Sequence, residues 1–78
     1  MPCRVGITTN PVTRKAYWET NVVGFTKWRI LKRFWTQQEA QDYETSYAVR
    51  YGCVSSAGGQ PASGPWSVYR FDYTRKRA

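Results

Sequence analysis

Residues 36–52, TQQEAQDYETSYAVRYG, decide the fold because they contain the clearest helix of the chain. Thr36 and Glu39 have the spacing of a capping box, in which a hydroxyl and a carboxylate satisfy the free groups at a helix start. Small and aromatic residues then recur at helical spacing, and Gly52 ends the helix. The residues at that spacing are Ala40, Tyr43, Tyr47, Ala48 and Tyr51.

Outside this helix, β-branched, aromatic and alternating apolar residues predict three strands, at residues 3–9, 28–35 and 66–73. The strand at 66–73 carries apolar side chains in two alternating sets, one on each face. Tyr69, Phe71 and Tyr73 form the first set, and Trp66 and Val68 form the second.

A second helix is predicted to begin at Asn10 and Pro11, because Asn caps free amides and Pro is tolerated at the first helical position. It fades near Asn21 and is followed by a loop over residues 22–27, while residues 55–65 form a Gly- and Ser-rich surface loop. The order strand, helix, strand, helix, strand predicts an α+β fold, a three-stranded sheet with both helices packed on one face.

The length and composition limit the classes of protein to consider. A chain of 78 residues forms one domain, 1–78, and residues 74–78 are predicted to be a basic C-terminal tail. The chain has no histidine, which excludes catalytic triads and zinc sites built on histidine. No apolar run is long enough to cross a bilayer and no signal-peptide pattern opens the chain, so we expect neither membrane insertion nor export.

Cys3 and Cys53 are the only cysteines. A single bridge between them is one reading, but a two-cysteine chain is not a disulfide framework. We therefore expect free buried thiols in a reducing cytosol, and hence a cytoplasmic location.

The charge balance is the strongest compositional signal. Twelve Lys and Arg face five Asp and Glu, which gives a net charge of +7 and favours polyanionic partners. Several of the cations are interleaved with aromatic residues, a pattern typical of nucleic-acid binding, although charge also serves solubility. The predicted nucleic-acid contacts are Arg4, Arg14, Lys15, Lys27, Arg29, Lys32, Arg33, Arg75, Lys76 and Arg77.

Glu44 and Arg14 are the side chains most suited to chemistry. Glu44 borders the apolar stripe of its helix, where a carboxylate needs a cation or a metal ion. One Glu is enough for a weak Mg²⁺ site, but a structural pairing with Arg14 or Arg50 at a solvated rim also explains it. Arg14 can brace a phosphate or stack on Trp18.

The aromatic residues divide into candidate bases and core residues. A phenol acts as a base when nearby cations lower its pKa, which makes Tyr17, Tyr69 and Tyr73 candidates. The helical spacing of Tyr43, Tyr47 and Tyr51 favours a place in the core. We expect Trp28, Trp35 and Trp66 to be core residues first and base-stacking platforms second.

Two segments resemble the GIY-YIG endonuclease superfamily. Residues 4–14, RVGITTNPVTR, resemble its YIG strand and the following helix, with Arg14 eight residues after Gly6. Residues 28–44 resemble its third strand and the helix that carries the metal-binding glutamate, here Glu44. The resemblance implies a nuclease scaffold that uses Mg²⁺ or Mn²⁺, in a small member of the kind that a phage or mobile element carries.

The resemblance also has two departures. Arg4 stands where the family has the tyrosine of YIG, and no GIY strand precedes it. Residues 68–73 are predicted to lie beside the first strand in its place, which would bring Tyr69 or Tyr73 into the site as catalytic residues with Arg14 and Glu44.

These observations support three functions. The first is a nucleic-acid-binding domain, with DNA as the partner, whose nuclease activity is weak or lost. The second is an active endonuclease that depends on a divalent metal. The third is a catalytically inactive scaffold whose basic surface binds and inhibits an acidic protein partner, as phage inhibitors do.

Overall fold

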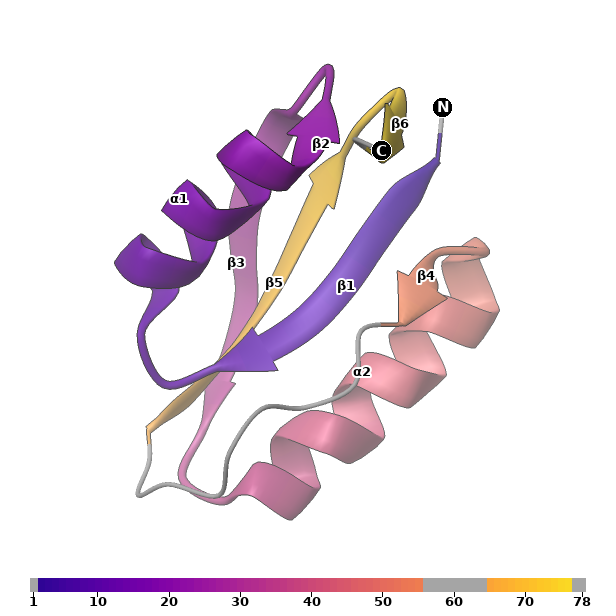
Figure 1. Cartoon of the computed structure of the whole chain (residues 1–78). Coiled ribbons are helices and arrows are strands. Elements are labelled where there is room, and N and C mark those ends of the chain that lie inside the picture. Colours follow the sequence, from indigo (N-terminus) through magenta and orange to yellow (C-terminus); the bar gives the residue numbers. More distant parts are fainter. Residues whose placement is uncertain (1, 56–64, 77–78) are drawn as a thin grey trace.

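The computed structural model describes residues 2–55 and 65–76. A four-stranded sheet runs through the protein in the order β3-β5-β1-β4, and a two-stranded sheet pairs β2 with β6 (Figure 1). The elements are β1 (Cys3–Thr8), α1 (Pro11–Asn21), β2 (Val22–Val23), β3 (Thr26–Phe34), α2 (Gln37–Tyr51), β4 (Val54–Ser55), β5 (Trp66–Asp72) and β6 (Arg75–Lys76). The α+β class is confirmed, whereas the expectation of three strands is wrong.

The last long strand lies in the middle of the sheet. β5 is antiparallel to β1, with Gly6 opposite Tyr69, and antiparallel to β3, with Ile30 opposite Tyr69. The prediction that residues 68–73 lie beside the first strand is therefore confirmed. The pairing with β3 shifts register twice, and one shift includes Lys27, which has a positive φ of 58°.

The two helices cover opposite faces of the sheet (Figure 1), so the expectation that both pack on one face is wrong. Ala40 of α2 packs with one set of strand residues, and Trp18 of α1 packs with the alternate set. The physical reason lies in β5, which is buried on both sides and therefore needs a cover on both. The α2 side buries Val5, Ile7, Trp66 and Val68, and the α1 side buries Val22, Tyr69, Phe71 and Tyr73.

Local signals in the sequence fix the ends of both helices. The Asn10 side chain accepts a hydrogen bond from the Thr13 amide at 3.2 Å, and Pro11 occupies the first turn of α1. The Thr36 hydroxyl accepts from the Glu39 amide at 3.2 Å and donates to the Glu39 carboxylate at 2.8 Å. Gly52 ends α2 in the left-handed conformation, which glycine adopts without steric cost.

The C-terminal segment is more ordered than a tail. Arg75 and Lys76 form β6, which pairs with Val23 and Val22 of β2. These two valines belong to residues 22–27, which we expected to be a loop. Thr74 stabilises the pairing of β2 with β6, because its amide donates a hydrogen bond to the Val23 carbonyl at 2.8 Å. Arg77 and Ala78 of the predicted tail, and most of the predicted loop at 55–65, lie outside the described residues.

A disulfide joins Cys3 to Cys53, so the expectation of free thiols is wrong. The short strand β4, which the sequence did not reveal, explains the bond. Its parallel pairing with β1 places Val54 opposite Arg4, and this brings the two cysteines to a Cα–Cα distance of 4.8 Å. Disulfides persist in oxidising surroundings, so the cytoplasmic location remains a prediction without support from the cysteines. No helix in the described part of the chain is long and apolar enough to span a membrane.

Candidate functional site

Tyr69 lies at the centre of the candidate site because two other elements meet at its hydroxyl group. The hydroxyl lies so close to Gly6 of β1 that a Cβ atom at that position would overlap with it. Only glycine allows this close approach. From α1, the indole Nε1 of Trp18 donates a hydrogen bond to the Tyr69 hydroxyl at 2.9 Å. Residue 69 is therefore fixed by β1 and α1 as well as by its own strand.

The surroundings of Tyr69 keep its phenol protonated. The ring is 2% exposed and stacks on Trp28, with the ring centroids 4.8 Å apart. Burial raises the pKa of Tyr69 above its usual value of 10.0 and outweighs the opposing effects of the Trp18 hydrogen bond and of the Arg14 and Arg4 charges. A general base requires a lowered pKa, so the raised pKa of Tyr69 does not suit that role. The expectation that nearby cations give this phenol a lowered pKa is therefore wrong.

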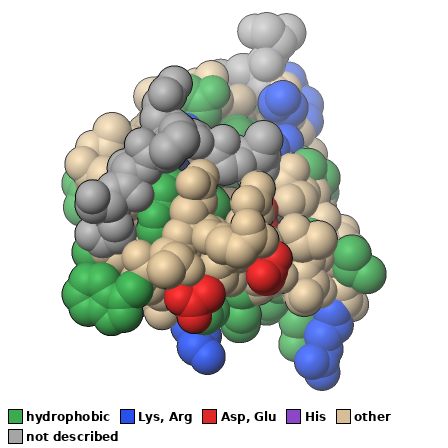
Figure 2. Space-filling model, turned by 90° about the horizontal axis from the view of Figure 1, so that it is seen from below, with side chains coloured by type: hydrophobic (Ala, Val, Ile, Leu, Met, Phe, Trp, Pro, Cys, Tyr) green, Lys and Arg blue, Asp and Glu red, His purple; other side chains and the backbone are tan. Residues whose placement is uncertain are grey.

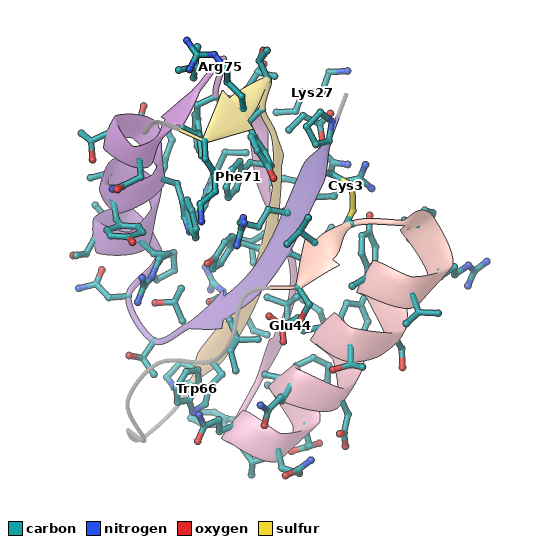
Figure 3. All side chains as sticks on the ribbon, turned by 45° about the vertical axis from the view of Figure 1, so that its right-hand side comes forward. Cys3, Lys27, Glu44, Trp66, Phe71 and Arg75 are labelled. Carbon is teal, nitrogen blue, oxygen red and sulfur yellow. A yellow bond between two sulfur atoms is a disulfide. The ribbon has the colours of Figure 1, made fainter. Side chains whose placement is uncertain are left out.

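Glu44 lies on the other side of the sheet, on the buried face of α2. It points from the helix toward the sheet (Figure 3) and is 2% exposed, so the reading of a solvated rim is wrong. Burial raises the pKa of Glu44 to about 7, while a hydrogen bond with the Ser55 side chain acts in the opposite direction. Its Oε2 atom has no hydrogen-bond partner among the described residues.

Arg14 and Glu44 are linked through Tyr69 and not by direct contact. The only ion pair within the described ranges joins Arg70 Nε to Asp72 Oδ1, at 3.7 Å. Arg14 and Glu44 nevertheless both act on Tyr69, since the first lowers its pKa and the second raises it. Both charges thus act on the Tyr69 phenol, although Glu44 lies on the opposite face of the sheet.

The two arginines that we expected near this site are stacked on aromatic rings. The Arg14 guanidinium lies 5.2 Å from the ring centroid of Tyr17, so the alternative in which Arg14 stacks on Trp18 is wrong. It is Arg4 that lies over Trp18, at 4.7 Å. Arg4 also lies 6.0 Å from the ring of Tyr73, which is 6% exposed in the α1-side core. Tyr73 is therefore placed as a core residue, away from solvent.

The residues around Glu44 do not fit a divalent cation. Among residues 2–55 and 65–76 there is no group of three Asp, Glu, Cys or His that could hold a metal ion. Mg²⁺ keeps several waters when it binds one carboxylate, and Glu44 is nearly inaccessible to solvent. The expected Mg²⁺ or Mn²⁺ remains a prediction, and we derive no chemical step through it.

The predicted nucleic-acid contacts are mostly at the surface. Arg4 and Arg14 are partly buried, Arg77 lies outside the described residues, and the others are exposed: Lys15, Lys27, Arg29, Lys32, Arg33, Arg75 and Lys76. Lys27 and Arg75 lie at the same end of the molecule (Figure 3). The opposite end, seen from below in Figure 2, has acidic side chains near its centre and basic side chains toward its rim. Positive charge is thus not concentrated on the face shown in Figure 2, where acidic and basic side chains are mixed.

Two aromatic predictions need correction. Trp28 and Trp66 lie in the cores as expected, but Trp35 is 78% exposed because it follows the last residue of β3. Tyr43 and Tyr47 are partly buried and pack against the α2-side core, whereas Tyr51 is 52% exposed and does not fit the expectation of a core residue. The helical spacing placed these tyrosines on one side of α2 but did not show that this side borders an open groove.

Comparisons with protein-family models, with curated proteins and with solved structures found no match to this chain. The fold and the site therefore define only a small α+β protein with a mixed four-stranded sheet, a disulfide and a buried Tyr69–Trp18 pair.

Proposed function

We propose that this protein is a nucleic-acid-binding domain that contacts the phosphate backbone with exposed Lys and Arg side chains. A net charge of +7 attracts polyanions. Contacts to phosphate require exposed Lys and Arg side chains, which replace the counter-ions of the nucleic acid. DNA is the partner in this proposal, and the resemblance to GIY-YIG endonucleases is consistent with it.

The observation that carries the proposal is the lack of acidic partners for the exposed cations. Of the five acidic residues, Asp72 lies beside Arg70, Glu44 is buried, and Glu39 accepts from Thr36. Asp42 accepts from Gln38, which leaves Glu19, exposed on α1. None of the seven exposed cations among the predicted contacts forms an ion pair within the described part of the chain. These side chains therefore face solvent without a salt bridge among the described residues.

The basic end formed by Lys27, Arg75 and Lys76 is the surface to test. The antiparallel pairing of β2 with β6 fixes the backbone at Arg75 and Lys76, and the bulge in β3 fixes it at Lys27. Cations on a fixed backbone lose less conformational freedom on binding than cations on a free tail.

The test is fluorescence anisotropy of a labelled DNA duplex across salt concentrations. We expect affinity to fall steeply from low to physiological salt, and the triple variant Lys27→Gln/Arg75→Gln/Lys76→Gln to reduce the log–log slope by about 1 for each lost phosphate contact. Val49→Gln, at an uncharged position that is 81% exposed, is the matched control. Absence of binding at low salt, or a flat salt response, would overturn the proposal. In that case, capture of one acidic protein from nuclease-treated lysate would support the inhibitor function.

In this proposal nuclease activity is weak or lost. Its support is the protonated, buried state of Tyr69 and the presence of Arg4 in place of a tyrosine. Supercoiled plasmid incubated with Mg²⁺ or Mn²⁺ should stay supercoiled. Nicking by the wild-type protein that is lost in Glu44→Gln would instead establish a metal-dependent nuclease.

A further inference from the structure

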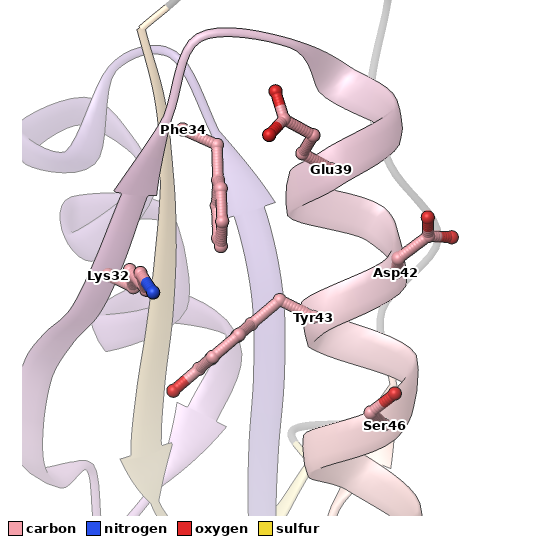
Figure 4. Close-up of a pocket in the computed structure, with 6 residues that line it drawn as sticks. All are labelled: Lys32, Phe34, Glu39, Asp42, Tyr43 and Ser46. Carbon is pink, nitrogen blue, oxygen red and sulfur yellow. The ribbon is translucent and has the colours of Figure 1, made fainter.

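A groove follows α2 on the face of the sheet that this helix covers. Two neighbouring hollows make up this groove, with volumes of about 400 and 170 Å³, and Tyr43 and Ser46 line both. The larger hollow lies between α2 and β3, and residues of α2 alone line the smaller one. Figure 4 shows the larger hollow, where Lys32 and Phe34 project from β3 and Tyr43 projects from α2.

Four aromatic rings form a row along this groove. The ring centroids of Phe34 and Tyr43 are 5.6 Å apart, those of Tyr43 and Tyr47 are 6.2 Å apart, and those of Tyr47 and Tyr51 are 4.3 Å apart. The spacing of four residues between the tyrosines produces the row, since such residues lie above one another on a helix. Tyr51 is the last ring of the row and is 52% exposed.

Phe34, Tyr43 and Tyr47 are partly buried and pack against the α2-side core, whereas Tyr51 at the end of the row does not. The buried face of α2 consists of Ala40, Glu44 and Ala48, which pack toward the sheet. The tyrosines lie at the border of that face, and their exposure increases from Tyr43 and Tyr47 to Tyr51. Aromatic side chains that remain partly exposed along a continuous groove are typical of binding surfaces.

The end of the groove near Tyr51 is positively charged. Arg70 donates to the Tyr47 hydroxyl at 2.6 Å and lies 5.8 Å from the ring of Tyr51. Arg50 lies 5.5 Å from the same ring. Asp72 offsets part of the Arg70 charge, whereas Arg50 forms no ion pair among the described residues, so this end is positively charged.

The other end of the groove carries two acidic side chains, each with one neutral hydrogen-bond donor. Glu39 accepts from the Thr36 hydroxyl and Asp42 accepts from Gln38. Lys32 lies 5.4 Å from the ring of Phe34 and faces them across the hollow. The charge along the groove therefore increases toward Tyr51, and this polarity gives an anionic ligand one preferred end.

We propose that this groove binds single-stranded nucleic acid, with a base stacked on Tyr51 at the open end of the aromatic row and a flanking phosphate bound by Arg50. Base faces are accessible in single strands and hidden inside a duplex, and stacking on aromatic side chains is the usual way to bind them. The inference rests on the proposed function and adds to it the form of the nucleic acid and the surface that selects it.

The test compares a labelled oligothymidine with a duplex of equal length at one salt concentration. We expect tighter binding of the single strand, and Tyr51→Ala to weaken it about tenfold while leaving duplex affinity and the salt slope unchanged. Tyr51→Trp should keep or raise the affinity for the single strand. Val49→Ala, on the same helix but outside the groove lining, is the matched control. Arg50→Gln should lower affinity and also reduce the salt slope.

The outcomes separate this inference from the proposed function. Two results would overturn the inference about the groove and leave the proposed function standing. One is equal binding of both forms. The other is an unchanged single-strand affinity in a Tyr51→Ala protein of wild-type melting temperature. Tyr51-dependent binding of an oligoglutamate peptide, without binding of either nucleic acid, would overturn both.

Discussion

The face of the sheet that α1 covers is closed, whereas the face that α2 covers is open along β3. On the closed face, Trp18, Trp28, Tyr69 and Phe71 pack ring against ring, and the polar contact between Trp18 and Tyr69 is sealed inside. On the open face, α2 turns alanines to the sheet and leaves its tyrosines in a groove. The comparison teaches that aromatic residues pack into the core on both faces, but only the α2 face leaves one end of its aromatic row, Tyr51, exposed.

The largest effect that we expect concerns the disulfide between Cys3 and Cys53, which links β1 to the end of α2 on the open face. Cys3→Ser/Cys53→Ser should lower the free energy of unfolding by about 4 kcal/mol, because the cross-link spans 50 residues and restricts the unfolded chain. Urea denaturation of the two proteins measures the difference. If the variant were as stable as the wild type, the pairing of β4 with β1 would hold α2 without the bond.

The second effect concerns Glu44, the charged group buried under α2. Below pH 4.5 the carboxyl is protonated in both the folded and the unfolded protein. As the pH rises toward 7, the unfolded protein loses this proton while the folded protein keeps it, so stability falls by roughly 3 kcal/mol across that range. Thermal denaturation between pH 4 and pH 8 should show this loss, and Glu44→Gln should remove it.

Glu19→Gln provides the matched control for Glu44, because Glu19 is exposed on α1. This variant should retain the pH dependence of the wild type. A Glu44→Gln protein with an unchanged profile would contradict the raised pKa of Glu44.

The third effect tests how tightly the closed face is packed. Gly6→Ala should destabilise the protein by about 1–3 kcal/mol, because the added methyl group overlaps with the Tyr69 hydroxyl. Tyr69→Phe in the same chain should not recover the loss, because the ring carbon Cζ also overlaps with the added methyl group and the Trp18 indole loses its acceptor. Chemical denaturation would show this. A Gly6→Ala protein of full stability would mean that Tyr69 moves freely and that this face is not closed.

The smallest effect compares the two helix caps. Thr36→Ala and Asn10→Ala should each cost about 1 kcal/mol, because each removes the acceptor for an amide in the first turn. Melting temperatures of the two variants measure this on the open and the closed face. Val49→Ala, at an exposed position, should change stability by less than about 0.5 kcal/mol.

Much of the local structure could be predicted from the sequence because its causes are local. The caps at Asn10 and Thr36, the stop at Gly52 and the two faces of β5 follow from residue types at fixed spacing. The pairing of β5 with β1 was predicted from the resemblance to GIY-YIG endonucleases.

The remaining features depend on contacts between distant residues. The disulfide requires β4, a pair of residues that is too short to show a period. The helices lie on opposite faces because β5 is a central strand. The periodicity of residues within a strand does not show the order of the strands in the sheet. For Tyr69 and Glu44 the residue types suggested chemistry, but burial decides their pKa values, and burial is a property of the assembled fold.

The central position of β5 also has a consequence for biosynthesis. This strand supplies residues to both hydrophobic clusters, and it follows every other long element in the chain. While it is still inside the ribosome, β1 and β3 have no strand between them and both helices face an incomplete sheet. A nascent chain of this protein therefore gains its cooperative structure only when residues 66–72 have emerged, and a chain interrupted before them leaves its aromatic residues exposed to chaperones and proteases.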